Sequence, residues 1–341
     1  MKSILRRGIV GTLASVAVTA LALPAMAQQA QQEAWKIGSA SQPGSALLTI
    51  LESNIGNWNK APGVKVERQF VASEQELAQQ VLRGRLPMAS ISFAGLSPAG
   101  LPELAVVNVP FLWSSEAERN AVLDGTVWKY VERLLEQKGL VAIGPGEVGW
   151  NGVVCKTACP TPESLKGLKA RVAPTPASRM FWQAMGANGV QMPLSELFPA
   201  LQQGLVVAAD LPFPYYVTTP ARESTPFYYD VRHLHHPGIV IANKAWFDKL
   251  TPAQQQSLRA GMLPVSQQRK MVSDEIADKV RDFRAKGGTY VELTPAQRDA
   301  YRQLVVPRQQ ELISSMGGKS SELFDLIKAA QREYQARGNR S

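Results

Sequence analysis

The stretch that decides the fold is residues 165–212, LKGLKARVAPTPASRMFWQAMGANGVQMPLSELFPALQQGLVVAADLP. Its pattern predicts a strand, a helix, a short strand, a second helix and a further strand, with Gly and Pro residues at the breaks. Arg171 lies in the first strand, in the short run KARV. Strands of an α/β layer are usually covered on both faces, so a guanidinium there requires a partner. On residue types alone, a structural ion pair and a carboxylate-binding arginine are equally good interpretations.

Residues 1–27 have the pattern of a secretory signal peptide. The basic residues Lys2, Arg6 and Arg7 precede an apolar run that ends in PAMA, which predicts cleavage after Ala27. The apolar run is short for a membrane anchor, and the residues that follow it are polar. The paired arginines leave both Sec and twin-arginine export open. We therefore expect an exported protein of the periplasm.

The composition is that of a globular protein with more than one domain. Removing the predicted signal peptide from the 341 residues leaves 314, enough for two domains that each bury a core. The formal net charge is +9, and three of the positive charges belong to the signal peptide. The basic residues are spread among acidic ones and do not alternate with aromatic residues, so we expect no nucleic-acid partner. A modest positive excess suits a small anionic ligand.

The two cysteines, Cys155 and Cys159, lie four residues apart. In an oxidising compartment we expect them to form a small-loop disulfide, with two free thiols as the alternative. A metal site is not expected, because two cysteines without a nearby histidine or aspartate fall short of a ligand set.

The segment before residue 94 predicts a parallel sheet with right-handed crossovers. Strands are expected at 35–40, 64–71 and 88–93, and helices at 46–59 and 73–84. Ligands of such sheets bind at the carboxyl ends of the strands. Two loops, SQPGS with Gln42 and SFAGLS with Phe93, are therefore expected at the rim of a cleft.

The remaining chain predicts a second α/β lobe and a return to the first. A helix is expected at 127–138, strands at 140–143 and 149–154, a loop or cleft wall at 213–238, and a helix at 265–286 that Pro264 separates from the preceding one. We assign residues 34–150 and about 240–275 to lobe I, and residues 151–239 and about 276–330 to lobe II. Residues 331–341 are expected to form a polar tail.

No enzyme motif accompanies this organisation. The sequence has no Gly-x-Ser-x-Gly elbow, no Walker loop and no His-Glu-x-x-His helix. Its only histidines, His233, His235 and His236, fall in the predicted loop, where we expect them on the surface or the cleft wall. A metal cluster there would need further ligands, for which Asp230 is the nearest candidate. We expect no enzyme, no metal and no cofactor; a periplasmic enzyme is the weaker alternative.

Four segments in sequence order resemble the periplasmic solute-binding proteins of TRAP transporters, the DctP family. They are PELAVVNVPFLW at 102–113, LKGLKARV at 165–172, MGANGVQMPLSELFPALQQGLV at 185–206 and VIANKAWFDKL at 240–250. The resemblance implies two α/β lobes with a hinge, a long helix spanning both, and a small organic acid captured in the cleft for a membrane permease. It also implies that Arg171 binds the ligand carboxylate. We expect a monomer. A sensor that passes the ligand signal to a partner protein is the alternative, because lobe closure serves both functions.

Three positions depart from the pattern of this family. Asn151 occupies the place of a frequent arginine, Leu194 that of a phenylalanine, and Leu211 that of an asparagine. Burying a carboxylate oxygen against a leucine, without a hydrogen bond, costs on the order of 1–3 kcal/mol of binding free energy. We therefore hypothesise a monocarboxylate with an apolar or aromatic part. Four aromatic residues are candidates to line its site: Trp150, Phe213, Tyr215 and Tyr216.

Overall fold

The computed structural model describes residues 33–41 and 43–338. The predicted signal peptide with its cleavage site, and Gln42, lie outside the described residues. None of the described helices combines the length and the apolar character needed to cross a membrane.

Nine strands in this part of the chain form one mixed sheet, in the order β2-β1-β3-β8-β4-β7-β5-β6, with β9 paired to β8. Strand β1 pairs in parallel with β2 and β3, as the alternation of strands and helices predicts, whereas β8 runs antiparallel to β3 and β4. The strands are β1 (Trp35–Ser39), β2 (Val66–Phe70), β3 (Met88–Ser92), β4 (Leu140–Cys155), β5 (Lys169–Val172), β6 (Asn188–Gln191), β7 (Ala208–Pro212), β8 (Phe227–Asn243) and β9 (Thr289–Glu292).

Strands β4 and β8 run through both halves of the sheet. The end of β8 pairs with β3, and its beginning pairs with β9. Strand β4 pairs with β8 along its length and with β7 only from Asn151 to Cys155. The β4–β8 register shifts once between Ala142 and Gly144. Two further shifts lie close together, between Glu147 and Gly149 and between Asn151 and Val153. Because bulges bend and twist a strand pair, these shifts mark the place where one half of the sheet gives way to the other.

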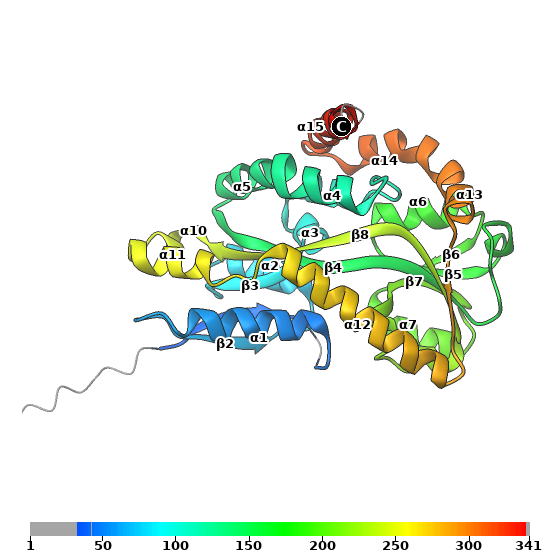
Figure 1. Ribbon diagram of the computed structural model, residues 1–341, viewed down its shortest axis with the longest axis horizontal. Coiled ribbons are helices and arrows are strands. Elements are labelled where there is room, and N and C mark those ends of the chain that lie inside the picture. The colour runs from blue at the N-terminus through cyan, green and yellow to red at the C-terminus, as the bar shows by residue number, and fades with distance from the viewer. Residues whose placement is uncertain (1–32, 42, 339–341) are drawn as a thin grey trace, which may run out of the picture. The chain divides into compact units, whose positions relative to one another are not determined.

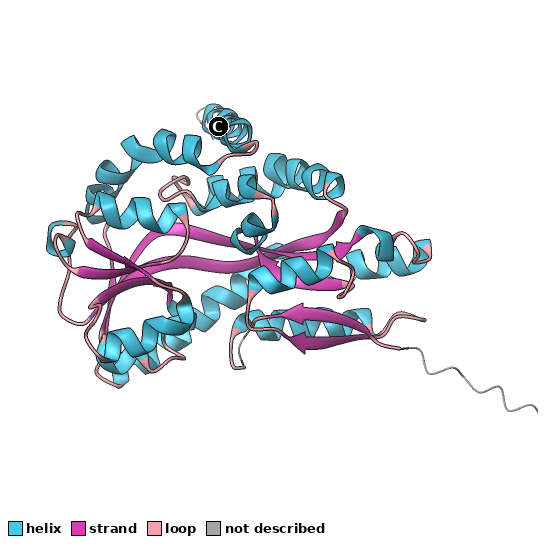
Figure 2. Cartoon of the chain, turned by 180° about the vertical axis from the view of Figure 1, so that it is seen from behind, coloured by secondary structure: helices cyan, strands magenta, loops and turns pink. Residues whose placement is uncertain are grey.

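Helices cover the sheet on both faces (Figures 1 and 2). They are α1 (Ala46–Trp58), α2 (Glu74–Leu82), α3 (Phe93–Leu96), α4 (Glu116–Val122), α5 (Trp128–Gln137), α6 (Pro176–Ala184), α7 (Leu194–Gln202), α8 (Phe213–Tyr216), α9 (Ala221–Ser224), α10 (Lys244–Phe247), α11 (Pro252–Ala260), α12 (Val265–Ala285), α13 (Pro295–Val305), α14 (Gln309–Met316) and α15 (Ser320–Gly338). The helices predicted between residues 46 and 138 are confirmed to within a few residues. The opening stretch has its predicted order, β5-α6-β6-α7-β7.

Helix α12 passes diagonally across the sheet (Figure 1). It packs against α1 and β4, and further along against α8 and β9. Pro264 is its N-cap residue and separates it from α11, as predicted, because proline cannot continue a preceding helix. The helix therefore contacts elements of both halves of the sheet.

The prediction of a loop over residues 213–238 is wrong. Residues 227–237 belong to β8, and two short helices, α8 and α9, precede it. Tyrosines in this region are buried in an aromatic cluster, in which the Tyr228 ring stacks on Tyr290 at 5.3 Å and contacts Phe213 edge-on at 4.8 Å. A Pro- and Tyr-rich sequence therefore forms a strand here, because its aromatic rings pack against each other across the sheet and helices.

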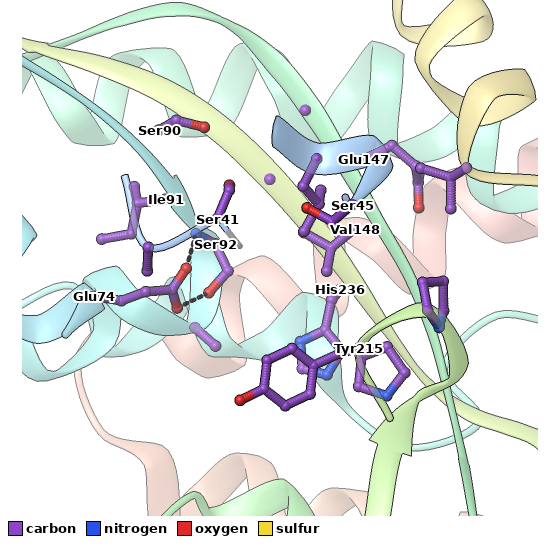
Figure 3. A pocket seen from close by; sticks show the side chains of 18 of the residues that line it. Ser41, Ser45, Glu74, Ser90, Ile91, Ser92, Glu147, Val148, Tyr215 and His236 are labelled. Carbon is purple, nitrogen blue, oxygen red and sulfur yellow. Dashed lines mark hydrogen bonds between the residues drawn. The ribbon is translucent and has the colours of Figure 1, made fainter. Parts of the chain in front are cut away.

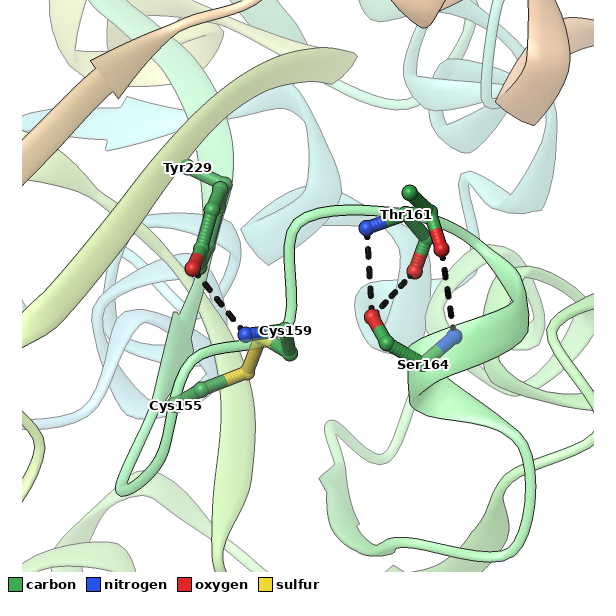
Figure 4. Close-up of a disulfide and its surroundings, with 5 residues drawn as sticks. All are labelled: Cys155, Cys159, Thr161, Ser164 and Tyr229. Atoms are coloured by element: carbon green, nitrogen blue, oxygen red, sulfur yellow. Dashed lines mark hydrogen bonds between the residues drawn. A yellow bond between two sulfur atoms is a disulfide. The ribbon is translucent and has the colours of Figure 1, made fainter.

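The predicted disulfide between Cys155 and Cys159 is present (Figure 4). Cys155 ends β4, and the backbone N–H of Cys159 donates to the Tyr229 hydroxyl on β8 at 3.0 Å. Both cysteines are buried. The bridge fixes the turn at which the chain leaves β4.

Residue 331, where the polar tail was predicted to begin, lies within a helix. Helix α15 continues from residue 331 to Gly338, and Gln331 is buried although its neighbour Arg332 is exposed. The Gln331 side-chain Nε2 donates to Leu112 O at 2.7 Å and to Glu118 Oε1 at 2.8 Å. Gln331 is polar, as expected of a tail. Its side chain nevertheless donates to buried backbone and carboxylate acceptors, so it belongs to the core.

We predict that Gln331→Ala lowers the free energy of unfolding by about 1–3 kcal/mol, because two buried acceptors lose their donor. Urea unfolding followed by circular dichroism measures this change. The matched variant Arg332→Ala should stay within about 0.5 kcal/mol of the wild type. Equal effects of the two substitutions would contradict the packing of this part of α15.

Candidate ligand-binding site

A cavity of about 410 Å³ lies where the two halves of the sheet meet. One wall comes from the ends of β1 and β3 and from α1, and the other from β5, β7 and α8. Most of its wall is apolar, with side chains that include Leu47, Ile50, Ile91, Val148, Leu194, Leu211, Ile239, Met262 and Val272. The carboxyl ends of β1 and β3 border it, as the predicted parallel sheet requires.

Arg171 reaches the cavity from β5 and is 5% exposed. Its Nε donates to the backbone oxygen of Met192 at 3.2 Å. In the described part of the chain, this is the only hydrogen bond of its guanidinium, so both terminal nitrogens are left with donors to offer. Burial lowers the pKa of Arg171, while the negative charge of Asp210 opposes that shift.

Asp210 on β7 is the buried counter-charge of this region. Its Oδ1 accepts hydrogen bonds from the Trp182 indole nitrogen at 2.8 Å and from the Ser178 hydroxyl at 3.2 Å, both on α6. Its Oδ2 accepts from Asn151 Nδ2 at 2.8 Å and lies 3.5 Å from His233 Nε2. Three side chains from α6 and β4 therefore donate to this carboxylate, and His233 of β8 lies beside it.

The same partners keep Asp210 ionised. Burial by itself would raise the pKa of this carboxyl group, but His233, the charge of Arg171 and the Trp182 indole together hold it well below the usual range. Because a buried carboxylate without such partners would take up a proton, the surrounding donors determine the charge at the centre of the site.

A second carboxylate, Glu147, lies on β4 and touches the cavity. It pairs with His235 at 2.7 Å and with Arg269 of α12 at 3.3 Å, and Arg119 lies 3.8 Å away. Burial would raise the pKa of Glu147, but its interaction with His235 and the charges of Arg119 and Arg269 lower it to about 2. Arg269 also forms a bidentate pair with Asp124, with distances of 2.6 and 2.7 Å. These bonds tie the bend of β4 to α12 and to the segment after α4.

The opposite wall of the cavity contributes a polar group from α2 and β3. The Glu74 carboxylate accepts the backbone N–H of Ser92 at 2.8 Å and the Ser92 hydroxyl at 2.6 Å (Figure 3). Ser90 and Ser41 lie on the same wall. Among the described residues that line the cavity, Arg171 is the sole lysine or arginine.

The structure places five of the predicted ligand-binding residues on the cavity wall: Arg171, Asn151, Leu194, Leu211 and Tyr215. It does not place Phe93, Trp150, Phe213 or Tyr216 there. Gln42 lies outside the described residues.

The aromatic residues that were predicted to line the cavity but lie elsewhere have other packing partners. The Trp150 ring lies 4.9 Å from the His235 ring, and the Arg119 guanidinium lies 5.2 Å above it. Phe213 belongs to the buried aromatic cluster, and Phe93 is 1% exposed within the core. In a strand, successive side chains point to opposite faces, so Asn151 can line the cavity while its neighbour Trp150 points away.

The carboxylates of the site, Asp210, Glu147 and Glu74, were not identified from the sequence. The signal that would have identified Asp210 is a charged residue inside the apolar run VVAADLP. No signal in the sequence shows that Glu74 reaches across to Ser92.

The histidine prediction needs correction as well. His233 and His235 are buried in β8 rather than in a loop, and His236 lines the cavity wall as expected. Within the described residues, no group of three histidine, cysteine or acidic side chains is arranged to hold a metal ion.

With this geometry established, comparison with known proteins identifies the family. The model of the DctP family, "Bacterial extracellular solute-binding protein, family 7", matches residues 70–315. The chain belongs to this family. It is thus a periplasmic solute-binding protein of the TRAP transporter type and not an enzyme, which confirms the resemblance of its four segments.

Relatives in the DctP family cover most of the chain. The 2,3-diketo-L-gulonate-binding periplasmic protein YiaO of Escherichia coli is 31% identical over 266 residues, 76% of this chain and 79% of that protein. The C4-dicarboxylate-binding periplasmic protein DctP of Rhodobacter capsulatus is 25% identical over 336 residues, 96% of this chain and 100% of its own. The sugar-acid-binding protein DctPAm of Advenella mimigardefordensis, solved with galactonate, has the same fold, with a TM-score of 0.77, 22% identity and coverage of 87% and 98%. The two-lobed α/β fold class is therefore confirmed.

We predict that this DctP-family protein loses stability as the pH falls from 7 to 5. Burial and the neighbouring histidines lower the pKa of His236 to about 4, although Asp210 and Glu147 oppose the shift. The unfolded chain therefore takes up the proton first, near pH 6.5, and the native state is disfavoured by on the order of 2 kcal/mol by pH 5.

Thermal unfolding at pH 7, 6 and 5 measures this loss. His236→Gln keeps the size of the side chain and removes its titration, so its unfolding temperature should fall less steeply over the same range. Parallel profiles for the variant and the wild type would contradict the role of His236.

Proposed function

We propose that this protein captures a small monocarboxylate with an apolar body and delivers it to the membrane subunits of a TRAP permease. The observation that carries the proposal is the Arg171 guanidinium in an apolar cavity, with both terminal nitrogens unbonded to any described residue. A guanidinium with two parallel donors matches a carboxylate in bidentate geometry. The buried site strengthens such a pair, because little water competes for its donors.

The relatives bind acids that share this carboxylate and differ in their remaining groups. These ligands are 2,3-diketo-L-gulonate, a C4-dicarboxylate and galactonate. In the present cavity, Leu211 and Leu194 lie on the wall and Arg171 is the one cation among its described residues. A second carboxylate or a row of hydroxyl groups would lose hydration against these leucines. This supports an acid with one carboxylate and an aliphatic or aromatic remainder.

Capture by closure of two lobes also has support. We propose lobe I at 34–150 and about 240–275, and lobe II at 151–239 and about 276–330, with β4 and β8 as the connection. Lys279 of α12 donates to Gly44 O at 3.3 Å and to Pro214 O at 3.4 Å, which belong to different proposed lobes. A ligand that contacts both lobes stabilises the closed arrangement. The size of this effect is the difference between its binding free energies for the closed and the open arrangement. We expect the protein to act as a monomer.

We predict that Arg171→Ala weakens binding of 4-methylpentanoate at least about 100-fold, because two charge-assisted hydrogen bonds are lost. Isothermal titration calorimetry measures the affinity. The thermal unfolding transition should remain, because the other partners of Asp210 do not depend on Arg171.

Arg179→Ala is the matched control. Arg179 is an exposed arginine of α6 that donates to Gln191 at 3.1 Å, and its removal should leave the affinity unchanged. Affinity of the Arg171 variant within a few-fold of the wild type would contradict the proposed carboxylate contact. A wild-type protein that binds galactonate and succinate but not 4-methylpentanoate would contradict the apolar ligand class.

A further inference from the structure

Strand β6 forms one edge of the sheet. In the described part of the chain it pairs with β5 alone, and all four of its residues, Asn188–Gln191, are exposed. A strand that is hydrogen-bonded on one side and buries no side chain opens locally at low cost in free energy. The strand begins with the pair Asn188-Gly189, in which the glycine has no side chain to shield its backbone nitrogen.

The register of the β5–β6 pair leaves the N–H group of Gly189 at the open edge. Asn188 N donates to Leu168 O at 2.8 Å, and Met192 N donates to Val172 O at 3.2 Å. In a parallel pair, alternate residues of a strand bond to the same neighbouring strand. Gly189, one position after Asn188, therefore points its N–H away from β5, and no described strand pairs with β6 on that side.

The side chain of Asn188 lies at the surface beside this nitrogen. Among the described residues, its one side-chain hydrogen bond runs from Nδ2 to Gly167 O, at 2.9 Å between exposed groups. Water replaces such a bond at little cost, because both partners remain solvated. When β6 opens, the side-chain amide carbon of Asn188 can then approach the backbone nitrogen of Gly189.

We infer that Asn188 is a site of spontaneous deamidation. The Gly189 nitrogen attacks Asn188 Cγ and loses its proton, and the side-chain nitrogen leaves as ammonia, which closes a succinimide ring. A water molecule then opens this ring at either carbonyl group and yields aspartate or isoaspartate. The net reaction consumes water and releases ammonia. It leaves a carboxylate at the edge of the sheet in place of a neutral amide.

The other Asn-Gly pair of the sequence, Asn151-Gly152, provides an internal control. Both of its residues are buried in β4, which has β7 on one side and β8 on the other. Asn151 Nδ2 also donates to Asp210 Oδ2 at 2.8 Å. Opening the backbone here would disrupt the centre of the sheet, so we expect this pair to stay intact in the folded protein.

The test is peptide mass spectrometry of the wild-type protein during incubation at mildly alkaline pH, with the unincubated sample as the baseline. In the folded protein, the peptide with Asn188 should deamidate at least about 10-fold faster than the peptide with Asn151, because an edge strand opens more readily than a central one. In urea, the two peptides should deamidate at similar rates. Equal rates in the folded protein, or an Asn188 that reacts only in urea, would overturn the inference.

Isoaspartate at this position affects the ligand site through β6. It lengthens the backbone by one carbon, so the residues that follow lose their register with β5. Val190 pairs with Arg171 in that register, and Met192 O is the acceptor of Arg171 Nε at 3.2 Å. We therefore expect the binding-competent fraction of the protein to fall as isoaspartate accumulates. This consequence rests on the proposed function, whereas the deamidation itself does not.

Calorimetry with 4-methylpentanoate, before and after the incubation, measures this fraction. Asn188→Gln is the matched control, because it keeps an amide whose longer side chain closes a ring much more slowly. The variant should keep its binding capacity, and the wild type should lose capacity in proportion to its isoaspartate content. Full capacity in wild type that contains isoaspartate, or equal losses in both proteins, would contradict the consequence. If fresh wild type binds no acid, the proposed function fails, and the mass spectra still decide the deamidation.

Discussion

The buried carboxylate of Asp210 is the constraint on which the site depends. A charge at this depth must be compensated by donors, and here α6 and β4 supply them, while His233 of β8 lies 3.5 Å away. The same negative charge makes it possible to keep Arg171 buried with its terminal donors unused. The Asp210 carboxylate therefore connects the elements of this half of the sheet. It also stabilises the buried Arg171 guanidinium, whose terminal nitrogens remain available to a ligand.

The continuity of β4 and β8 connects this half to the other. The two strands pair along most of their lengths, and two of their three register shifts fall between Glu147 and Val153, beside the cavity. The pairing of Glu147 with His235 and Arg269 ties this bend to α12. A ligand in the cavity thus lies against the segment that would bend if the two lobes moved, which is the arrangement that ligand-driven closure requires.

The sequence predicted the elements whose signals are local. The first three strands, the helices predicted at 46–59 and 73–84, and the strand that carries Arg171 all agree with the structure. The prediction for residues 213–238 did not agree with the structure. The burial of Tyr228 and Phe213 depends on aromatic partners, such as Phe283 and Tyr290, that are far away in sequence. Trp150 was predicted to line the site as an aromatic residue, whereas the alternation of β4 turns it toward Arg119. Predictions failed where long-range packing decided the outcome.

The most direct test of the account is a mass spectrum of the small molecules released from the protein after purification without refolding. The account predicts a carboxylate of small size at close to one molecule per protein, present in the wild type and missing from Arg171→Ala. A released molecule without a carboxylate, or the same carboxylate retained at full occupancy by the variant, would contradict the claim that Arg171 holds the ligand.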